Sequence, residues 1–222
     1  MAVELDHVFV CASVGAPEAD LLRALGLSDG QPNRHPGQGT ACRRFFFANA
    51  YLELLWVENP AEAQGEVARP LRFWERWSQR AEGTCPFGLV FRSGQEGGLL
   101  PFPTWEYRPP YLPPPQGIHM GVNSECVEEP LLACFRGGCR PDARPVQSRP
   151  ALDHKAGFRE LTALRMFSPH VAVRSPAMRA AEQTGTVAFL PGPGYLVELG
   201  FDGERQGQCA DLRPAMPLVL CW

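Results

Sequence analysis

The stretch HPGQGTACRRFFFANAYLELLWVEN, residues 35–59, decides the fold. It contains two β-rich runs, ACRRFFFAN and YLELLWVEN, which are joined so closely through Asn49 and Ala50 that they predict a β-hairpin. Before it, the run from Leu5 to Ala12 is typical of a strand, and APEADLLRALG is typical of a helix that Pro17 begins and Gly26 ends. The first part of the chain is therefore predicted to be a strand, a helix and a hairpin.

Composition limits the partners of the protein. The 222 residues are 45% hydrophobic, which is enough for one sizeable core or two modest ones. Charged residues make up 20% of the chain and the formal net charge is -3, so no basic surface for nucleic acid or for an anionic membrane is expected. Lys155 is the sole lysine, and this bias towards arginine, alanine and proline indicates a GC-rich and hence bacterial coding sequence.

The cysteines and the N-terminus point to one compartment. Eight cysteines are spread along the chain without a CxxC pair or a zinc-ligand spacing, which favours free and mostly buried thiols. The start MAVELDHVFVC has neither a basic region nor a long apolar one, and no later apolar run is long enough to span a bilayer. A cytoplasmic protein with no membrane contact is expected.

The C-terminal part repeats the plan of the first part. ELTALRMFSP predicts a strand, and SPAMRAAEQTG predicts a helix capped by Ser175 and closed by Gly185. TVAFLPGPGYLVELGFDG then predicts a hairpin, and MPLVLCW a last strand. In both parts a tyrosine leads into an apolar strand with one glutamate, Glu53 in YLELL and Glu198 in YLVEL. The repeat predicts an α+β fold of two βαβββ modules that form a curved mixed sheet around a pocket.

The expected modules are residues 1–94 and 159–222. The first of them ends with a helix over residues 70–81 and a strand in CPFGLVFRSG. Residues 95–158 are rich in proline and glycine and are expected to hold short strands. This segment has two interpretations: a connection that wraps the surface, or the strands of the second module.

A histidine and a glutamate are the first candidates for the site. Strand periodicity places Leu5, His7, Phe9 and Cys11 on one face and Tyr51, Glu53, Leu55 and Val57 on another, so His7 and Glu53 could meet across a curved sheet. Such a pair suits zinc, iron, nickel or manganese. The alternative is an internal polar link from Glu53 to His7 or to an arginine, Arg43 or Arg44.

Other candidates lie around this pair. His35 and the Thr40 amide, in the loop HPGQGT, could face a bound anion or form a plain turn. His154 could reach the mouth of the pocket or lie on the surface. The aromatic residues expected in the pocket wall or in the core are Phe45, Trp56, Trp105 and Tyr107.

The segments LDHVFVCA, ALGL and HPGQGTACRRFFFANAYLELLWVEN resemble the first module of the vicinal oxygen chelate superfamily, and within it the glyoxalase-like domain proteins. PFPTWEY and DHKAGFRELTALRMF resemble that subgroup's later strands. The resemblance implies that His7 and Glu53 are metal ligands of the first module and that Glu198 matches the last ligand. It also implies a third ligand from the first strand of the second module. At that position this chain has Phe87 or Gly88, or else Ala163, none of which binds metal.

Two functions from different classes follow. The first is a lyase or isomerase, or a related dioxygenase, in which His7, Glu53 and Glu198 hold a divalent metal while Glu53 or Glu198 moves a proton of a small oxygenated metabolite. The second is a metal-free protein that binds and sequesters an apolar or anionic metabolite, with His7 and Glu53 as hydrogen-bonding groups. A structural or regulatory role is a third interpretation. The expected partner is a small molecule, and a homodimer is compatible with this fold.

Overall fold

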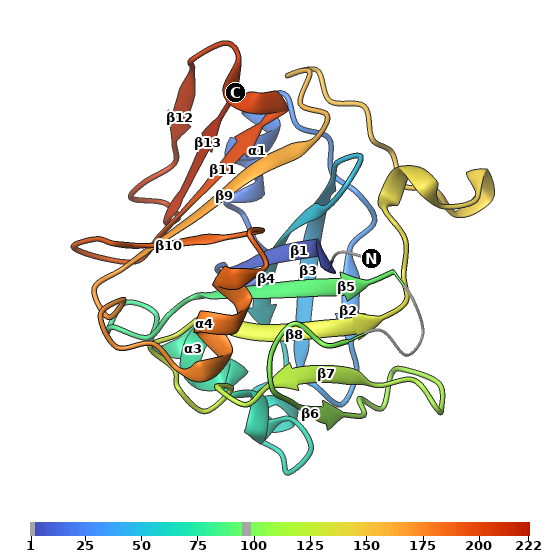
Figure 1. Cartoon of the computed structure of the whole chain (residues 1–222). Helices are drawn as coiled ribbons and strands as arrows, with labels where there is room; N and C mark the ends of the chain where they lie inside the picture. The colour runs from blue at the N-terminus through green and yellow to red at the C-terminus, as the bar shows by residue number, and fades with distance from the viewer. Residues whose placement is uncertain (1–2, 95–98) are drawn as a thin grey trace.

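The computed structural model of the chain describes residues 3–94 and 99–222. Strands dominate and helices are short, so the α+β fold class expected from the sequence is confirmed. The described strands form two sheets, one of eight strands and one of five (Figure 1).

The eight-stranded sheet has the order β2-β3-β4-β1-β5-β8-β7-β6. Its central strands β1 and β5 are antiparallel, and each has a parallel outer neighbour, β4 next to β1 and β8 next to β5. The two halves therefore share one strand order, as in a duplicated module. The strands are β1 (Val3–Cys11), β2 (Asn33–His35), β3 (Thr40–Phe46), β4 (Tyr51–Val57), β5 (Phe87–Ser93), β6 (Thr104–Tyr107), β7 (Ile118–Gly121) and β8 (Leu131–Arg136).

This topology moves the expected module boundaries. CPFGLVFRSG contributes β5, which begins the second half of the sheet, so it does not end a first module of residues 1–94. The Pro-rich segment 95–158 contributes β6, β7 and β8, which is the second of the two interpretations given above. Figure 1 shows the strands at the two ends of the sheet running in different directions, as expected for a strongly curved sheet.

Residues 159–222 form a sheet of their own, with the order β10-β9-β11-β13-β12. Its central pair, β9 and β11, is antiparallel and is flanked by the parallel neighbours β10 and β13, so the C-terminal part repeats the centre of the larger sheet in a shorter form. This repetition explains why the sequence suggested a second module here. The strands are β9 (Leu161–Ser168), β10 (Ala188–Pro191), β11 (Leu196–Phe201), β12 (Cys209–Asp211) and β13 (Leu218–Cys221).

The helices connect the strands. Ser175 caps α4 by accepting a hydrogen bond from the Met178 amide at 3.1 Å, and Gly185 follows with a φ of +73°, as the sequence predicted. The helices are α1 (Ala19–Ala24), α2 (Pro60–Ala63), α3 (Phe73–Ser78) and α4 (Pro176–Gln183), with short 3₁₀ turns at Arg69–Leu71, Pro141–Ala143, Val146–Ser148 and Asp202–Glu204.

The C-terminal sheet packs on one face of the eight-stranded sheet. A single buried cluster joins Val8 and Leu54 of the larger sheet to Leu164 and Leu199 of the smaller one. The opposite face of the larger sheet carries a separate cluster that includes Phe9 and Leu55. The eight-stranded sheet therefore has one face covered by the C-terminal sheet and one face free to form a pocket.

An irregularity in β1 changes the expected pattern of faces. The pairing of β1 with β5 shifts between Leu5 and His7. As a result Leu5 joins the cluster between the sheets, whereas His7, Phe9 and Cys11 face the other side. The expectation that Leu5 shares a face with His7 is wrong because a β-bulge interrupts the alternation of side chains.

Two of the eight cysteines are not free. Cys209 of β12 and Cys221 of β13 are cross-strand neighbours and form a disulfide, which the spacing of cysteines in the sequence did not suggest. The six free cysteines fit the prediction better, since Cys11, Cys42, Cys85 and Cys134 are buried.

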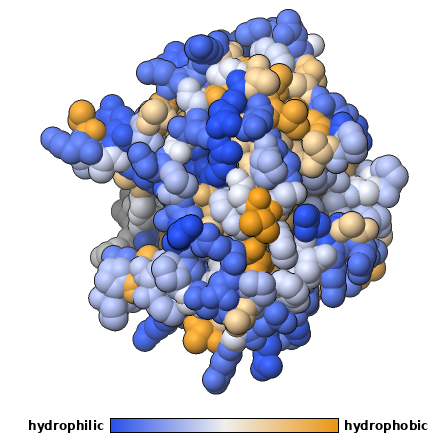
Figure 2. All heavy atoms as spheres, turned by 180° about the vertical axis from the view of Figure 1, so that it is seen from behind, coloured by the Kyte–Doolittle hydropathy of each residue, from blue (hydrophilic) through white to orange (hydrophobic). Residues whose placement is uncertain are grey.

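The surface shown in Figure 2 is mostly hydrophilic. Hydrophobic residues on the part of this face that the structure describes form small separate spots rather than a broad patch. Among the described residues there is no helix that is both long and apolar enough to cross a bilayer.

Candidate functional site

A cavity of about 220 Å³ lies on the face of the eight-stranded sheet that the C-terminal sheet leaves open. Both halves of the sheet line it, and they contribute different chemistry. The first half supplies most of the polar side chains together with the apolar Phe9 and Leu55, whereas the second half supplies mainly apolar ones. The polar set is His7, Asn33, His35, Gln38, Tyr51 and Glu53, and the second half contributes Val90, Tyr107, Ile118, Met120, Leu131, Ala133 and Phe135.

His7 sits between two carboxylates. Its Nδ1 donates to Asp6 Oδ1 at 2.8 Å, and its Nε2 lies 3.5 Å from Glu53 Oε2. The ring also stacks on Tyr51, with the ring centroids 4.2 Å apart. Burial opposes ionisation of Asp6, but the bond from His7 and the nearby charge of Arg92 outweigh it and hold the pKa of Asp6 below its ordinary value. Asp6 thus fixes the orientation of the imidazole, so that Nε2 points at Glu53.

Glu53 is a buried carboxylate, with 5% of its surface exposed. The Cys42 thiol, on the neighbouring strand, donates to it. Burial, followed by the negative charge of Glu53, raises the pKa of this thiol. The two arginines considered as partners of Glu53 are engaged elsewhere, since Arg43 pairs with Asp29 and Arg44 donates to the Gln31 carbonyl.

His35 is held at the end of β2 by two hydrogen bonds. Asn33 Nδ2 lies 3.0 Å from Nε2, and because an amide nitrogen is a donor, Nε2 accepts. The ring proton is then on Nδ1, which donates to Thr40 Oγ1 at 2.9 Å. Burial lowers the pKa of His35. The loop that was predicted from its glycines is tight, with positive φ at Gly37 and Gly39, but the short strand β2 that leads into it was not foreseen.

Three of these side chains form a compact group of potential metal ligands. One ligand atom each of His35, Cys42 and Glu53 lies within 4.8 Å of the other two. All three come from the first half of the sheet. An imidazole, a thiol and a carboxylate together form a donor set that suits zinc.

The second half of the sheet does not supply the ligands implied by the resemblance. On β5, Phe87 belongs to the core between the sheets, and Gly88 is packed so closely that an added Cβ would lie 1.9 Å from the Phe9 ring. The residues of β5 and β8 that line the cavity are Val90, Leu131, Ala133 and Phe135. None of them can ligate a metal, so a site shared between the two halves does not fit this chain.

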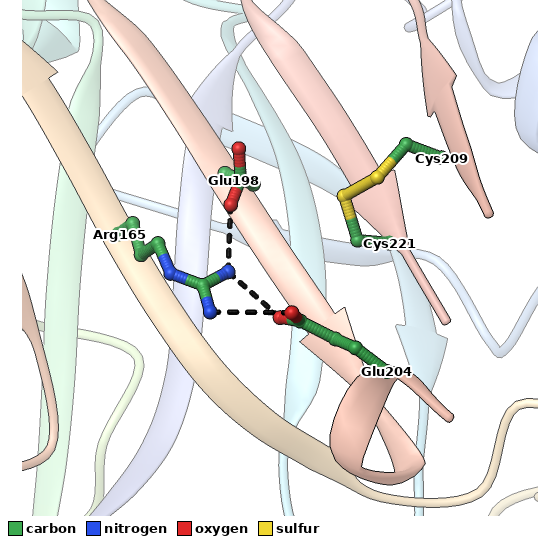
Figure 3. The surroundings of a disulfide bond; sticks show 5 residues. All are labelled: Arg165, Glu198, Glu204, Cys209 and Cys221. Atoms are coloured by element: carbon green, nitrogen blue, oxygen red, sulfur yellow. Dashed lines mark hydrogen bonds and ion pairs between the residues drawn. A yellow bond between two sulfur atoms is a disulfide. The ribbon is translucent and has the colours of Figure 1, made fainter. Parts of the chain in front are cut away.

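Glu198 is not part of the cavity. It lies on β11 in the C-terminal sheet, where Arg165 binds its carboxylate at 2.6 Å and also binds Glu204 (Figure 3). Its neighbours Val197 and Leu199 are fully buried between the sheets, so alternation turns Glu198 away from the eight-stranded sheet. The expected site of His7, Glu53 and Glu198 is therefore not formed, and Glu198 has no catalytic position at the cavity.

The other expected pocket residues divide into two groups. Tyr107 lines the cavity, and Thr40 supports it through His35. Phe45 and Trp56 belong to the core between the sheets, because they alternate with residues that face the cavity.

Two further candidates also lie away from the cavity. Trp105 lies at the edge of the cluster and donates to Ser124 Oγ at 3.1 Å. His154 is buried and does not line the cavity; the Ser28 amide donates to its Nδ1, and its Nε2 donates to the Phe46 carbonyl. It therefore joins separate chain segments, and the expectation that it lies at the pocket mouth or on the surface is wrong.

Several residues of the cavity were missed. Cys42 could have been found, because the hairpin places it on the same face of β3 and β4 as Glu53. Phe73, the first residue of α3, and Tyr111, in the loop after β6, were not found because the packing of this helix and this loop against the sheet depends on the tertiary structure. Tyr107 was expected, but its buried hydroxyl, which has no hydrogen-bond partner among the described residues, could not be anticipated.

Comparisons with known proteins agree with this architecture. Residues 5–96 match the model of a family described as glyoxalase-like domain, and this match runs from β1 through β5. The crystal structure of a hypothetical protein from Staphylococcus aureus shares the fold over 99% of this chain and 98% of that chain, with a TM-score of 0.54 and 9% sequence identity. No curated protein matches the chain significantly. Residues 5–96 are therefore similar to the glyoxalase-like domain family, which is the resemblance noted in the sequence.

Proposed function

We propose that the protein binds a small molecule that has a neutral hydrogen-bonding head and a flat apolar body. The observation that supports this proposal is that the polar side chains of a mainly apolar cavity are gathered on the first half of the sheet. Ligand pockets are commonly apolar cavities with a few polar groups that fix orientation. The head of the ligand would lie against His7, His35 and Glu53, and the body against the side chains of the second half.

The charges around the cavity favour a neutral head. Among the described residues that line the cavity there is no arginine or lysine, and the carboxylate among them is Glu53. An anionic head would approach a buried carboxylate without a compensating cation, which is unfavourable in a site shielded from water. The structure thus supports the apolar metabolite of the two considered above, rather than the anionic one.

The unpartnered hydroxyl of Tyr107 supports the same proposal. It is buried at the apolar wall, and burying a hydroxyl without a partner costs about 1 to 3 kcal/mol. A ligand with a second polar atom would remove this cost. The side chain is therefore suited to recognise an oxygenated ligand rather than a pure hydrocarbon.

A matched pair of probes tests the proposal. 2-Naphthol and 2-naphthoate share one flat body but carry a neutral hydroxyl and an anionic carboxylate. Isothermal titration calorimetry on chelator-treated protein is expected to show that 2-naphthol binds at least about tenfold more tightly than 2-naphthoate. An Ala133→Phe variant, which fills the cavity from the apolar wall, should abolish binding, whereas Val122→Phe at an exposed position should not. Equal affinity for both probes, or binding that survives Ala133→Phe, would contradict the proposal.

A second candidate is an isomerase or lyase in which Glu53 accepts a proton from a carbon acid. The alignment of Asp6, His7 and Glu53 favours this candidate, because Asp6 orients the imidazole of His7 so that its Nε2 faces the carboxylate that would take the proton. The chain's own residues would orient the substrate, exclude water and hold the proton on Glu53.

Deuterium exchange separates this candidate from simple binding. In D₂O, 2-tetralone exchanges the protons next to its carbonyl group, and proton NMR follows the loss of their signal. If the protein is a catalyst, the wild-type protein should make exchange faster than it is in buffer alone, and Glu53→Gln should lose this acceleration. Exchange at the buffer rate, together with normal 2-naphthol binding, would identify a binding protein.

A further inference from the structure

We propose that His35, Cys42 and Glu53 form a zinc-type divalent metal site within the first half of the sheet. This site keeps Glu53 of the expected set but replaces His7 and Glu198 by His35 and Cys42, so all three ligands come from the first half of the sheet. The ligand atoms of the three residues already lie within 4.8 Å of one another. Ligand atoms around a tetrahedral zinc are about 3.3 to 3.8 Å apart, given bond lengths of about 2.0 to 2.3 Å, so small side-chain rotations complete the geometry.

The hydrogen bonds around the two histidines support a cation at this point. His35 donates through Nδ1 to Thr40, and His7 donates through Nδ1 to Asp6, so each ring turns its Nε2 towards the interior. Metal-binding histidines usually donate their second nitrogen to such an oxygen, which fixes the ring and its tautomer. The Asn33 amide, which now bonds Nε2 of His35, must move aside for ligation.

The contact between His7 and Glu53 supports the same conclusion. The Nε2 of His7 lies 3.5 Å from the Glu53 carboxylate. This distance is longer than an ordinary N–H···O hydrogen bond of about 2.9 Å. A cation bound to Glu53 would compensate the charge of this carboxylate and lie close to Nε2 of His7.

The ligand types indicate which metal and which coordination. A thiolate with an imidazole and a carboxylate favours zinc over magnesium or calcium. Cys42 lies behind the cavity wall, whereas His35 and Glu53 line it, so a fourth position would face the cavity. Three protein ligands and one open position are the pattern of catalytic zinc sites. Binding replaces the proton of the Cys42 thiol, so each metal ion bound releases one proton to solvent.

Cobalt provides the test, because Co²⁺ occupies zinc sites and a thiolate bound to it absorbs in the near ultraviolet. Tag-free protein is treated with a chelator, dialysed and titrated with Co²⁺. The charge-transfer band should saturate at one Co²⁺ per chain. Cys42→Ser should abolish the band, and His35→Ala should weaken Co²⁺ binding by at least about tenfold. Cys134→Ser is the matched control, since Cys134 is an equally buried strand cysteine outside the cluster, and it should keep the band.

Two results would overturn the site. One is the absence of a charge-transfer band in the wild-type protein. The other is a band that persists in Cys42→Ser, which would assign the metal to another cysteine. If Cys42→Ser fails to fold by circular dichroism, His35→Ala decides, and unchanged Co²⁺ affinity in that variant rejects the proposal. The inference goes beyond the binding function proposed above, which 2-naphthol tests on metal-free protein.

Discussion

The two glutamates Glu53 and Glu198 stand in similar apolar strands but in opposite surroundings. Glu53 lines a cavity, is buried and has a histidine and a thiol as neighbours. Glu198 is partly exposed on the C-terminal sheet and is neutralised by Arg165 (Figure 3). The difference shows that a repeated strand sequence forms a second copy of a site only if the strand also presents the same face to the pocket.

The largest expected effect tests whether the C-terminal sheet belongs to the same core. Leu199 is fully buried between the sheets, so Leu199→Ala should lower the free energy of unfolding by about 2 to 5 kcal/mol. Leu196→Ala, three residues earlier on the opposite face of β11, is the matched control and should have a clearly smaller effect. Urea unfolding measures both. Equal effects at the two positions would show that the face assignment of β11, and with it the position of Glu198, is incorrect.

A pH effect is expected from His154, which lies at a junction of chain segments rather than in the cavity. Burial lowers its pKa, and its Nδ1 accepts a hydrogen bond from Ser28, which a protonated ring could not do. His154 takes up a proton near pH 6.5 in the unfolded chain and at lower pH in the folded chain. The contribution of neutral His154 to the free energy of unfolding should therefore be fully present above about pH 6.5 and decrease as the pH falls towards 5.

Urea unfolding between pH 5 and 8 measures this dependence. The slope of stability against pH should become shallower in His154→Gln, and the remainder should reflect His35 and His119, whose pKa values are also lowered by burial. A slope that His154→Gln leaves unchanged would contradict the neutral, buried state of this histidine.

The smallest expected effect is a gain in stability. Tyr107→Phe removes a buried hydroxyl that lacks a partner, so the variant should be more stable than the wild type by about 1 kcal/mol. Thermal unfolding of the ligand-free protein measures it, with Tyr111→Phe as the control, because the Tyr111 hydroxyl donates to Gln38 and its loss should not stabilise. A destabilised Tyr107→Phe variant would mean that the hydroxyl already has a partner.

Much of the first half of the sheet could be predicted from the sequence. Periodicity and turn residues located β1, α1 and the hairpin of β3 and β4, and they brought His7 and Glu53 to one place. Cap residues located α4 as well. These features depend on local preferences, which a single sequence carries directly.

The second half of the sheet could not be predicted in the same way. Strands β6 and β7 have four residues each and lie in a Pro-rich segment, so their pairing depends on the tertiary structure. The position of Glu198 did have a signal. Glu53 comes two residues after Tyr51, whereas Glu198 comes three residues after Tyr195, so the two glutamates have opposite parity relative to the tyrosine.

The most direct test of the account compares Glu53→Gln with Glu198→Gln in the calorimetric titration of 2-naphthol and 2-naphthoate. Glu53→Gln is expected to reduce the preference for 2-naphthol at least about tenfold, because it removes the charge that disfavours the anionic head. Glu198→Gln should keep the wild-type preference within about twofold. An unchanged preference in Glu53→Gln, or an equal reduction in both variants, would contradict the placement of the binding site in the first half of the sheet.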